Sequence, residues 1–213
     1  MSFDPLARSY RALEFVLAGG LLQRCRTTFL AGTAGCRRAL LLGEGPGRFL
    51  VPLLQANPQV EVLCVEQSPR MIETALRHLQ RRRLAGPRVR FEQADALKWR
   101  PPPGEFDLLV THFFLDCFRR DELRMLIPTI AIGARPDARW LLADFRLPER
   151  GWRRYRARLV LALMYAFFRC ATGLSASCLT PPDALLEAAG FRLAGRRLAN
   201  FGLVGSDLWL RTV

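Results

Sequence analysis

The sequence predicts an α/β fold in which helices cover both faces of a doubly wound, mostly parallel sheet of seven strands. Two observations support this prediction. Five short apolar segments alternate with segments of helical periodicity. These apolar segments lack a polar face, which is typical of strands buried on both sides of a parallel sheet. Two further strand-like segments close the chain and predict an antiparallel hairpin at the sheet edge.

Each expected strand is an apolar run bounded by turn-forming or polar residues. The five alternating strands are expected at residues 39–43, 60–66, 88–95, 106–114 and 138–145, and the closing pair at 191–199 and 202–213.

The helices are expected from periodicity and from start and stop signals. Pro46 is expected in the first turn of the helix that follows the first strand. Ser68 is expected to cap the next helix, with Pro69 at its first position and Gly86 beyond its end. The expected helices cover 46–56, 68–86, 120–134, 152–172 and 181–190, after one or two helices within residues 3–31.

Positive charge dominates the sequence, with a formal net charge of +13. Lys98 is the only lysine, so nearly all of this charge is arginine. A basic surface attracts nucleic acid, anionic lipid or an acidic substrate, whereas an arginine-rich chain with almost no lysine also fits a genome with GC-rich codons. Few arginines alternate with aromatic residues as a stacking platform for nucleic acid requires. We therefore favour the compositional explanation over a role in binding nucleic acid.

The cysteines do not have the pattern of a metal site. They form no CxxC pair and have no nearby histidine ligands, so no metal is expected. Several lie in apolar runs, as free thiols do in a reducing cytosol. The N-terminus shows no signal peptide, and the longest apolar run, residues 159–168, is too short to span a bilayer. The sequence thus predicts a cytoplasmic protein and leaves its oligomeric state open. The six cysteines are Cys25, Cys36, Cys64, Cys117, Cys170 and Cys178.

A glycine-rich stretch, ALLLGEGPGRFL, joins the first expected strand to the first expected helix of the alternating part. Glycine loses the most backbone freedom on folding, so Gly43, Gly45 and Gly47 indicate that something approaches the backbone closely there. In a doubly wound sheet, ligands bind beyond the carboxyl ends of the strands. A dinucleotide fingerprint, G-x-G-x-x-G, would need glycine where the chain has Arg48. The spacing is instead G-x-G-x-G.

This spacing is followed by Glu66 at the end of the second expected strand and Asp95 at the end of the third. The combination resembles class I S-adenosylmethionine-dependent methyltransferases, in particular the quinone and small-molecule branch. The resemblance covers most of the chain. It implies a Rossmann-like sheet, a small-molecule acceptor, S-adenosyl-L-methionine as the methyl donor and S-adenosyl-L-homocysteine as the product. It also implies a single domain with a helical lid (1–35), a cofactor-binding core (36–150), a substrate-cap helix (151–180) and a closing helix and hairpin (181–213).

The resemblance gives a role to each part of the motif. The glycine turn passes under the methionine part of the donor, and Glu66 holds the two ribose hydroxyls. Asp95 meets the adenine amino group, Ala96 supplies backbone, and Met71 packs on the adenine. Taken singly, these residues also fit a helix-terminal charge, a turn and the core; their order makes the set informative. The expected cofactor-binding residues are Gly43, Glu44, Gly45, Gly47, Glu66, Gln67, Met71, Asp95, Ala96 and Thr111.

One position departs from the family pattern. The family usually has an acid two residues before the first glycine, where this chain has Leu41. Glu44, inside the turn, is the nearest carboxylate. We therefore expect Glu44 to contact the ammonium group of the donor.

The reacting end of the site is expected just after the fourth strand, in THFFLDCF. Methyl transfer requires alignment, exclusion of water and, for some acceptors, removal of a proton. His112 is the candidate base because histidine titrates near neutral pH. Asp116 is the candidate for orienting it; the alternatives are a packing role for the histidine and a helix cap for the aspartate. Aromatic surface for the acceptor is expected from Tyr10, Phe113, Phe114 and Phe118.

Three functions stay open. THFFLDCF lacks the (D/N)PP(Y/F) signature of amino-group methylases, so we favour a small lipophilic or aromatic acceptor over RNA. The third function is a regulatory domain that binds the donor without catalysis. The helix expected at 152–172 begins with arginines and continues apolar. It suits a cap over a hydrophobic substrate, a helix resting on an anionic membrane, or a cover for the sheet edge.

Overall fold

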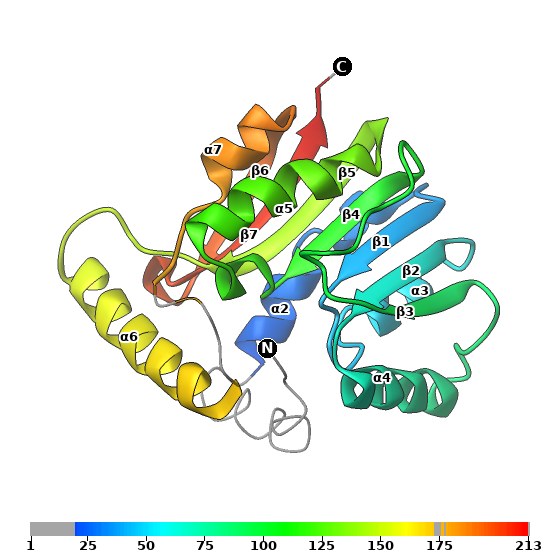
Figure 1. Ribbon diagram of the computed structural model, residues 1–213, viewed down its shortest axis with the longest axis horizontal. Helices are drawn as coiled ribbons and strands as arrows, with labels where there is room; N and C mark the ends of the chain where they lie inside the picture. Colours follow the sequence, from blue (N-terminus) through cyan, green and yellow to red (C-terminus); the bar gives the residue numbers. More distant parts are fainter. Residues whose placement is uncertain (1–19, 173–175, 177, 213) are drawn as a thin grey trace.

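The computed structural model describes residues 20–172, 176 and 178–212. A seven-stranded sheet in the order β3-β2-β1-β4-β5-β7-β6 forms its centre (Figure 1). Every strand expected from the sequence is present, and the α/β prediction is confirmed. The strands are β1 (Arg38–Leu42), β2 (Glu61–Glu66), β3 (Val89–Gln93), β4 (Phe106–His112), β5 (Ala134–Phe145), β6 (Phe191–Ala199) and β7 (Val204–Arg211).

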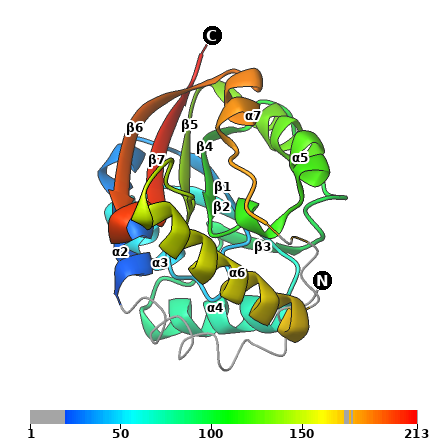
Figure 2. The same cartoon turned by 90° about the vertical axis from the view of Figure 1, so that its left-hand side faces the viewer.

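The helices cover both faces of this sheet. In chain order the α-helices are α2 (Leu21–Thr27), α3 (Leu50–Ala56), α4 (Pro69–Arg81), α5 (Arg120–Ile132), α6 (Trp152–Thr172) and α7 (Asp183–Ala188). Short 3-10 helices occur at η2 (Leu30–Thr33), η3 (Leu115–Cys117) and η4 (Asn200–Gly202). Figures 1 and 2 show α5 and α7 on one side of the sheet and α2 and α3 on the other. None of the helices in the described part of the chain is both long and apolar enough to cross a membrane.

Side-chain alternation along β1 explains why its sequence is apolar throughout. Leu40 and Leu42 belong to the core cluster under α5 and α7. Ala39 and Leu41 belong to the cluster on the opposite face, under α3. All four side chains are buried, so the strand has no solvent face.

The closing hairpin differs in one respect from the expected antiparallel edge. The last strand, β7, pairs antiparallel with both β5 and β6, so it lies inside the sheet and β6 forms the edge. Trp209 on β7 is opposite Trp140 on β5, and both rings are fully buried. The apolar side chains of β7 therefore have a neighbouring strand on each side.

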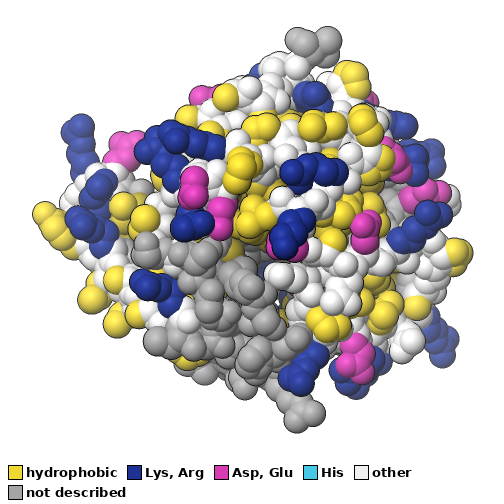
Figure 3. Space-filling view, in the orientation of Figure 1, with side chains coloured by type: hydrophobic (Ala, Val, Ile, Leu, Met, Phe, Trp, Pro, Cys, Tyr) yellow, Lys and Arg dark blue, Asp and Glu magenta, His cyan; other side chains and the backbone are white. Residues whose placement is uncertain are grey.

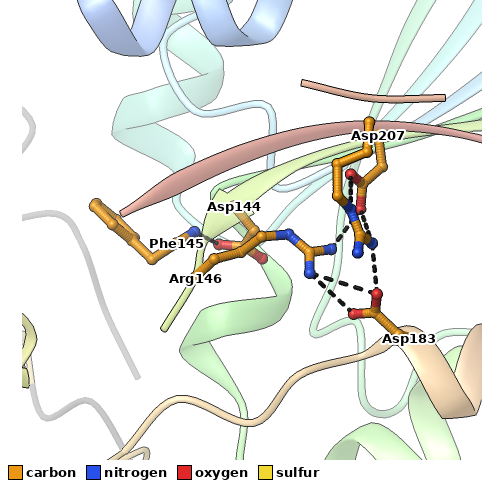
Figure 4. A network of polar contacts seen from close by, with 6 residues as sticks. Asp144, Phe145, Arg146, Asp183 and Asp207 are labelled. Atoms are coloured by element: carbon orange, nitrogen blue, oxygen red, sulfur yellow. Dashed lines mark hydrogen bonds and ion pairs between the residues drawn. The ribbon is translucent and has the colours of Figure 1, made fainter. Parts of the chain in front are cut away.

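Ion pairs fix the hairpin to the segment after β5. The guanidinium of Arg196 on β6 forms two hydrogen bonds to Asp207 on β7, at 2.7 and 2.9 Å. Arg146 contacts both Asp207 and Asp183 at the start of α7, as Figure 4 shows. Asp207 is buried, and the two arginines balance the negative charge of its carboxylate, which would be costly to bury unpaired.

Helix boundaries mostly follow the sequence signals. Ser68 Oγ accepts a hydrogen bond from the Met71 N–H at 3.2 Å, and Pro69 is the first residue of α4, as expected. The helix expected to open with Pro46 begins only at Leu50, so that expectation was wrong. The left-handed backbone of the preceding glycines keeps the intervening residues in turns.

Only part of the expected N-terminal lid lies within the described residues. Leu22 and Cys25 of α2 pack against Ala143 of β5 and Val204 of β7. Tyr10, expected to line the substrate pocket, lies outside the described residues.

Candidate active site

A cavity of about 270 Å³ lies at the carboxyl ends of β1, β2, β3 and β4. The strand order reverses between β1 and β4, and such reversals leave a crevice at the sheet edge. Of the residues predicted from the sequence, the cavity wall contains Gly43, Gly45, Glu66, Gln67, Met71, Asp95, Ala96, Phe113, Phe114 and Phe118. Segments far apart in the sequence thus converge on one site.

The three glycines of the turn serve three different purposes. All have a left-handed backbone, with φ of +64°, +60° and +81° at Gly43, Gly45 and Gly47. A Cβ on Gly43 would lie 2.2 Å from the Phe114 ring, and one on Gly47 would lie 3.3 Å from the Cβ of Ala75 in α4. A Cβ on Gly45 would meet no atom within 4 Å, and this residue lines the cavity. Only Gly45 therefore keeps open space for a ligand.

Glu66 is fixed at the cavity wall by two backbone N–H groups. One carboxylate oxygen accepts from the Gly45 N–H at 3.0 Å, and the other accepts from the Ser68 N–H at 2.9 Å. A carboxylate oxygen can accept more than one hydrogen bond, and hydroxyl groups are suitable donors to it. The side chain therefore links the glycine turn to the start of α4 and presents oriented acceptors.

Asp95 and the aromatic residues form other parts of the wall. Asp95 follows β3, and its Oδ1 accepts from the Leu97 N–H at 3.1 Å. Phe114 and Phe118 stand edge to face, with ring centroids 5.0 Å apart. The cavity thus combines carboxylates with an aromatic surface.

Comparisons with known proteins agree with this geometry. A family model described as a methyltransferase domain matches residues 39–137. The demethylmenaquinone methyltransferase of Deinococcus radiodurans is 28% identical over 98% of this chain and 89% of that protein. The demethylmenaquinone methyltransferase of Thermus thermophilus is 31% identical over 70% of this chain and 66% of that protein.

Two solved structures have the same fold. Mitomycin 7-O-methyltransferase MmcR superposes with a TM-score of 0.74 and 22% identity over the whole of this chain, which spans 61% of that protein. A Burkholderia thailandensis 1,6-didemethyltoxoflavin N1-methyltransferase with bound S-adenosylhomocysteine superposes with a TM-score of 0.68 and 19% identity, over 99% of this chain and 87% of that one.

The chain belongs to the class I S-adenosylmethionine-dependent methyltransferases. Its resemblance is to the quinone branch, and its cofactor is S-adenosylmethionine. The cavity of this methyltransferase fits that cofactor, because Gly45 leaves open space beside the doubly held carboxylate of Glu66.

Several cavity residues escaped the sequence analysis. Cys117 and Glu122 line the cavity from η3 and α5, and the remaining ones are Pro46, Val65, Ala94 and Leu97. Glu122 accepts a hydrogen bond from the Arg119 N–H at 2.8 Å, which caps α5. In the sequence, Glu122 is the third residue of the helix expected at 120–134. That position predicts a residue that caps the helix and gives no indication that it lines a cavity.

Glu44 does not lie in the wall of the methyltransferase cavity. One of its carboxylate oxygens accepts from the N–H groups of Phe49 and Leu50, at 2.6 and 2.8 Å, at the start of α3. Burial raises the pKa of Glu44 to about 7, and these two hydrogen bonds and Arg26 oppose the rise. In this arrangement Glu44 caps a helix, and its expected contact with the ammonium group of the cofactor stays a prediction.

Replacing Glu44 by glutamine is expected to change how stability depends on pH. Because folding raises the pKa of this carboxyl, the folded wild type binds more protons than the unfolded chain between the ordinary value of 4.5 and about 7. Wild-type stability therefore decreases as pH rises through this interval, by roughly 3 kcal/mol from this group. Glutamine keeps the acceptor oxygen without titrating. Urea unfolding at several pH values should show that the free energy of unfolding of Glu44→Gln increases relative to that of the wild type as pH rises. A difference that does not change with pH would contradict this account.

His112 lies at the end of β4 but not in the cavity wall. Its ring stands edge to face against Phe49, with centroids 4.6 Å apart, and among the described residues its Nδ1 has no hydrogen-bond partner. Burial and Arg26 lower the pKa of His112 well below its usual range, so the ring is neutral. Phe113, with φ of +53°, turns the chain after His112, and the following aromatic residues enter the cavity wall instead.

Asp116 does not pair with His112 in the structure. Its N–H donates to Asp144 Oδ2 at 3.0 Å, and its carbonyl accepts from the Tyr165 hydroxyl of α6 at 3.0 Å. The carboxyl groups of Asp116 and Asp144 lie together, and burial raises the pKa of both. The aspartate therefore connects the loop after β4 to β5 and α6.

Two further predictions concern Thr111 and a metal. Thr111 is fully buried, accepts from the Trp140 Nε1–H at 2.9 Å and does not line the cavity. Among the described residues, no group of His, Cys, Asp and Glu side chains could hold a metal ion.

Proposed function

We propose that this methyltransferase transfers the methyl group of S-adenosylmethionine to a small lipophilic or aromatic acceptor, quinols included. The observation that carries this proposal is the aromatic wall of Phe113, Phe114 and Phe118 in the same cavity as Glu66 and Asp95. The similarity to demethylmenaquinone methyltransferases supports an acceptor of this class.

We assign the cofactor to the part of the cavity lined by Gly45, Glu66 and Asp95. Glu66 would accept hydrogen bonds from the ribose hydroxyls, and Asp95 would accept one from the adenine amino group. Met71, which is buried in α4 and lines the cavity, would pack on the adenine ring. These roles are compatible with the two backbone hydrogen bonds that Glu66 accepts from Gly45 and Ser68.

The bound cofactor supplies a methyl group already activated on a sulfonium. The protein's own contribution is alignment and exclusion of water by the aromatic residues. His112 remains the candidate for accepting a proton, with Asp116 as the residue expected to orient it. Because neither lines the cavity, we expect transfer to depend more strongly on the cavity residues than on these two.

Labelled cofactor tests this proposal. The protein is incubated with methyl-labelled S-adenosylmethionine and with quinols, simple phenols, fatty acids or RNA. Label is expected on aromatic members of the panel. Replacing Phe113 by leucine should raise the KM of that acceptor by roughly three- to tenfold, because an aromatic contact is lost. The Kd of the cofactor should change little.

A matched variant is Phe145→Leu. Phe145 stands edge to face with Phe113 at 5.6 Å but is not part of the cavity wall, so its replacement should leave the KM nearly unchanged. Label found only on RNA, or on none of the lipophilic and aromatic compounds, would contradict the proposed acceptor class.

A further inference from the structure

Helix α6 is apolar on two opposite sides. Its inner side carries Ala157, Leu161 and Tyr165, which are buried against the ends of β5 and β7. Its outer side carries a row of large apolar residues spaced by three or four positions, so they share one helix face. These residues are Trp152, Tyr155, Leu159, Leu163 and Phe167, which are between 44% and 74% exposed. A helix that only covered a sheet edge would need just the inner side.

The exposed row continues onto the β6–β7 hairpin. Phe201 in η4 is 57% exposed, and its ring lies 5.5 Å from that of Trp152. The guanidinium of Arg156 lies 5.5 Å from the Phe201 ring and that of Arg153 lies 6.0 Å from it. We call the row and Phe201 together the α6 face.

Arginines border the α6 face. Helix α6 contains no acidic residue, and its arginines are Arg153, Arg154, Arg156, Arg158 and Arg169. Within the described ranges none of them forms an ion pair; Arg154 donates to the Glu149 carbonyl and Arg156 to the Asn200 side chain. In Figure 3, hydrophobic and basic side chains lie side by side at the edge of the molecule that α6 forms in Figure 1.

We propose that the α6 face docks this protein on the surface of an anionic lipid bilayer. An exposed apolar row with aromatic residues at one end and arginines at its borders is the pattern of a helix lying in the headgroup region. The apolar row inserts, and the arginines contact lipid phosphates and carboxylates, with the net charge of +13 adding attraction.

Two other occupants fit the α6 face less well. A second copy of the chain would bring two rows of unpaired arginines together, and like charges repel at an interface. A nucleic acid would leave the apolar row facing water, because its phosphates pair with the arginines alone.

Docking would also bring the active site close to the bilayer. The inner side of α6 packs near Phe113 and Cys117, which line the cavity. The Tyr165 hydroxyl further ties α6 to the loop after β4 through Asp116. A lipophilic acceptor would then have a short path to the cavity. The docking proposal itself does not depend on the acceptor.

Vesicle co-sedimentation of the full chain tests this proposal. Vesicles contain phosphatidylglycerol and phosphatidylcholine in equal parts, or phosphatidylcholine alone. The protein is expected to bind the anionic vesicles, and added salt should weaken this binding. Replacing both Leu159 and Leu163 by glutamate should weaken it at least about tenfold, because the apolar row can no longer insert.

The matched control is Met125→Glu with Ile132→Glu, two exposed apolar residues of α5. It changes the net charge by the same amount away from the α6 face and should reduce vesicle binding much less. Titration with S-adenosylmethionine checks that each variant is folded. The vesicle assay does not measure methyl transfer, so its outcome is independent of the test of the proposed function.

Three outcomes would overturn the proposal. The first is that the wild type does not bind anionic vesicles. The second is that the α6 and α5 variants lose binding equally, which would make net charge the cause. The third is that, without lipid, sedimentation velocity finds a wild-type dimer that the α6 variant converts to monomer, which would make this face an interface between copies.

Discussion

Replacing Glu66 by glutamine is expected to weaken S-adenosylmethionine binding by about a hundredfold, an effect of roughly 3 kcal/mol. Both carboxylate oxygens accept backbone N–H groups, from Gly45 at 3.0 Å and Ser68 at 2.9 Å. A glutamine amide has one oxygen, so its NH₂ group would face one of these donors. The side chain must then rotate away, and an acceptor for the ribose hydroxyls is lost.

Isothermal titration with S-adenosylmethionine and S-adenosylhomocysteine measures this effect. Glu61→Gln is the matched control, because Glu61 is exposed at the other end of the same strand. The affinity of the Glu61→Gln variant for both compounds should equal that of the wild type. Unchanged affinity in Glu66→Gln would mean that the carboxylate serves only to fix the glycine turn.

Replacing Gly43 by alanine is expected to destabilise the protein by about 3 kcal/mol and to disrupt cofactor binding. Left-handed backbone costs an alanine roughly 1 kcal/mol, and overpacking a filled site costs about as much again or more. The new methyl group would lie 2.2 Å from the Phe114 ring, which must leave the cavity wall. Urea unfolding and cofactor titration measure the two effects.

Two other glycines separate strain from steric overlap. Gly45→Ala and Gly35→Ala have comparable left-handed φ, of +60° and +80°, with no atom within 4 Å of the added Cβ. Each should cost roughly 1 kcal/mol of stability. Of these two glycines, Gly45 lines the cavity and Gly35 does not, so Gly45→Ala alone of the pair should also lower cofactor affinity, by about tenfold.

Phe114→Ala provides the decisive comparison for Gly43. If the ring causes the clash, the double variant Gly43→Ala/Phe114→Ala should be more stable than the sum of the single effects predicts, by at least about 1 kcal/mol. Strict additivity would mean that the loss of stability in Gly43→Ala comes from the left-handed backbone conformation alone.

The elements of this protein follow closely from local sequence. The apolar run 39–42 predicts a strand buried on both faces, and β1 is buried on both. Ser68 and Pro69 predict the start of α4 because capping depends on neighbouring residues only. The motif of Gly45, Glu66 and Asp95 could be recognised because each residue lies at or just beyond the carboxyl end of its own strand, and a parallel sheet brings those strand ends together.

The sequence does not determine the direction in which some side chains point. His112 and Glu44 have the residue types and positions of site residues, yet His112 packs on Phe49 and Glu44 caps α3. The left-handed backbone at Phe113 turns the chain after His112, and the glycine turn before Leu50 brings Glu44 to the start of α3.

By itself, the sequence determined the α/β class, the strands and the family, because periodicity, capping and glycine spacing are local properties of the chain. Only the tertiary structure decided that β7 lies inside the sheet, that Asp116 joins Asp144, and that the outer side of α6 stays exposed. These features arise between segments distant in sequence. Their free energy comes from burial and pairing that no single segment contains.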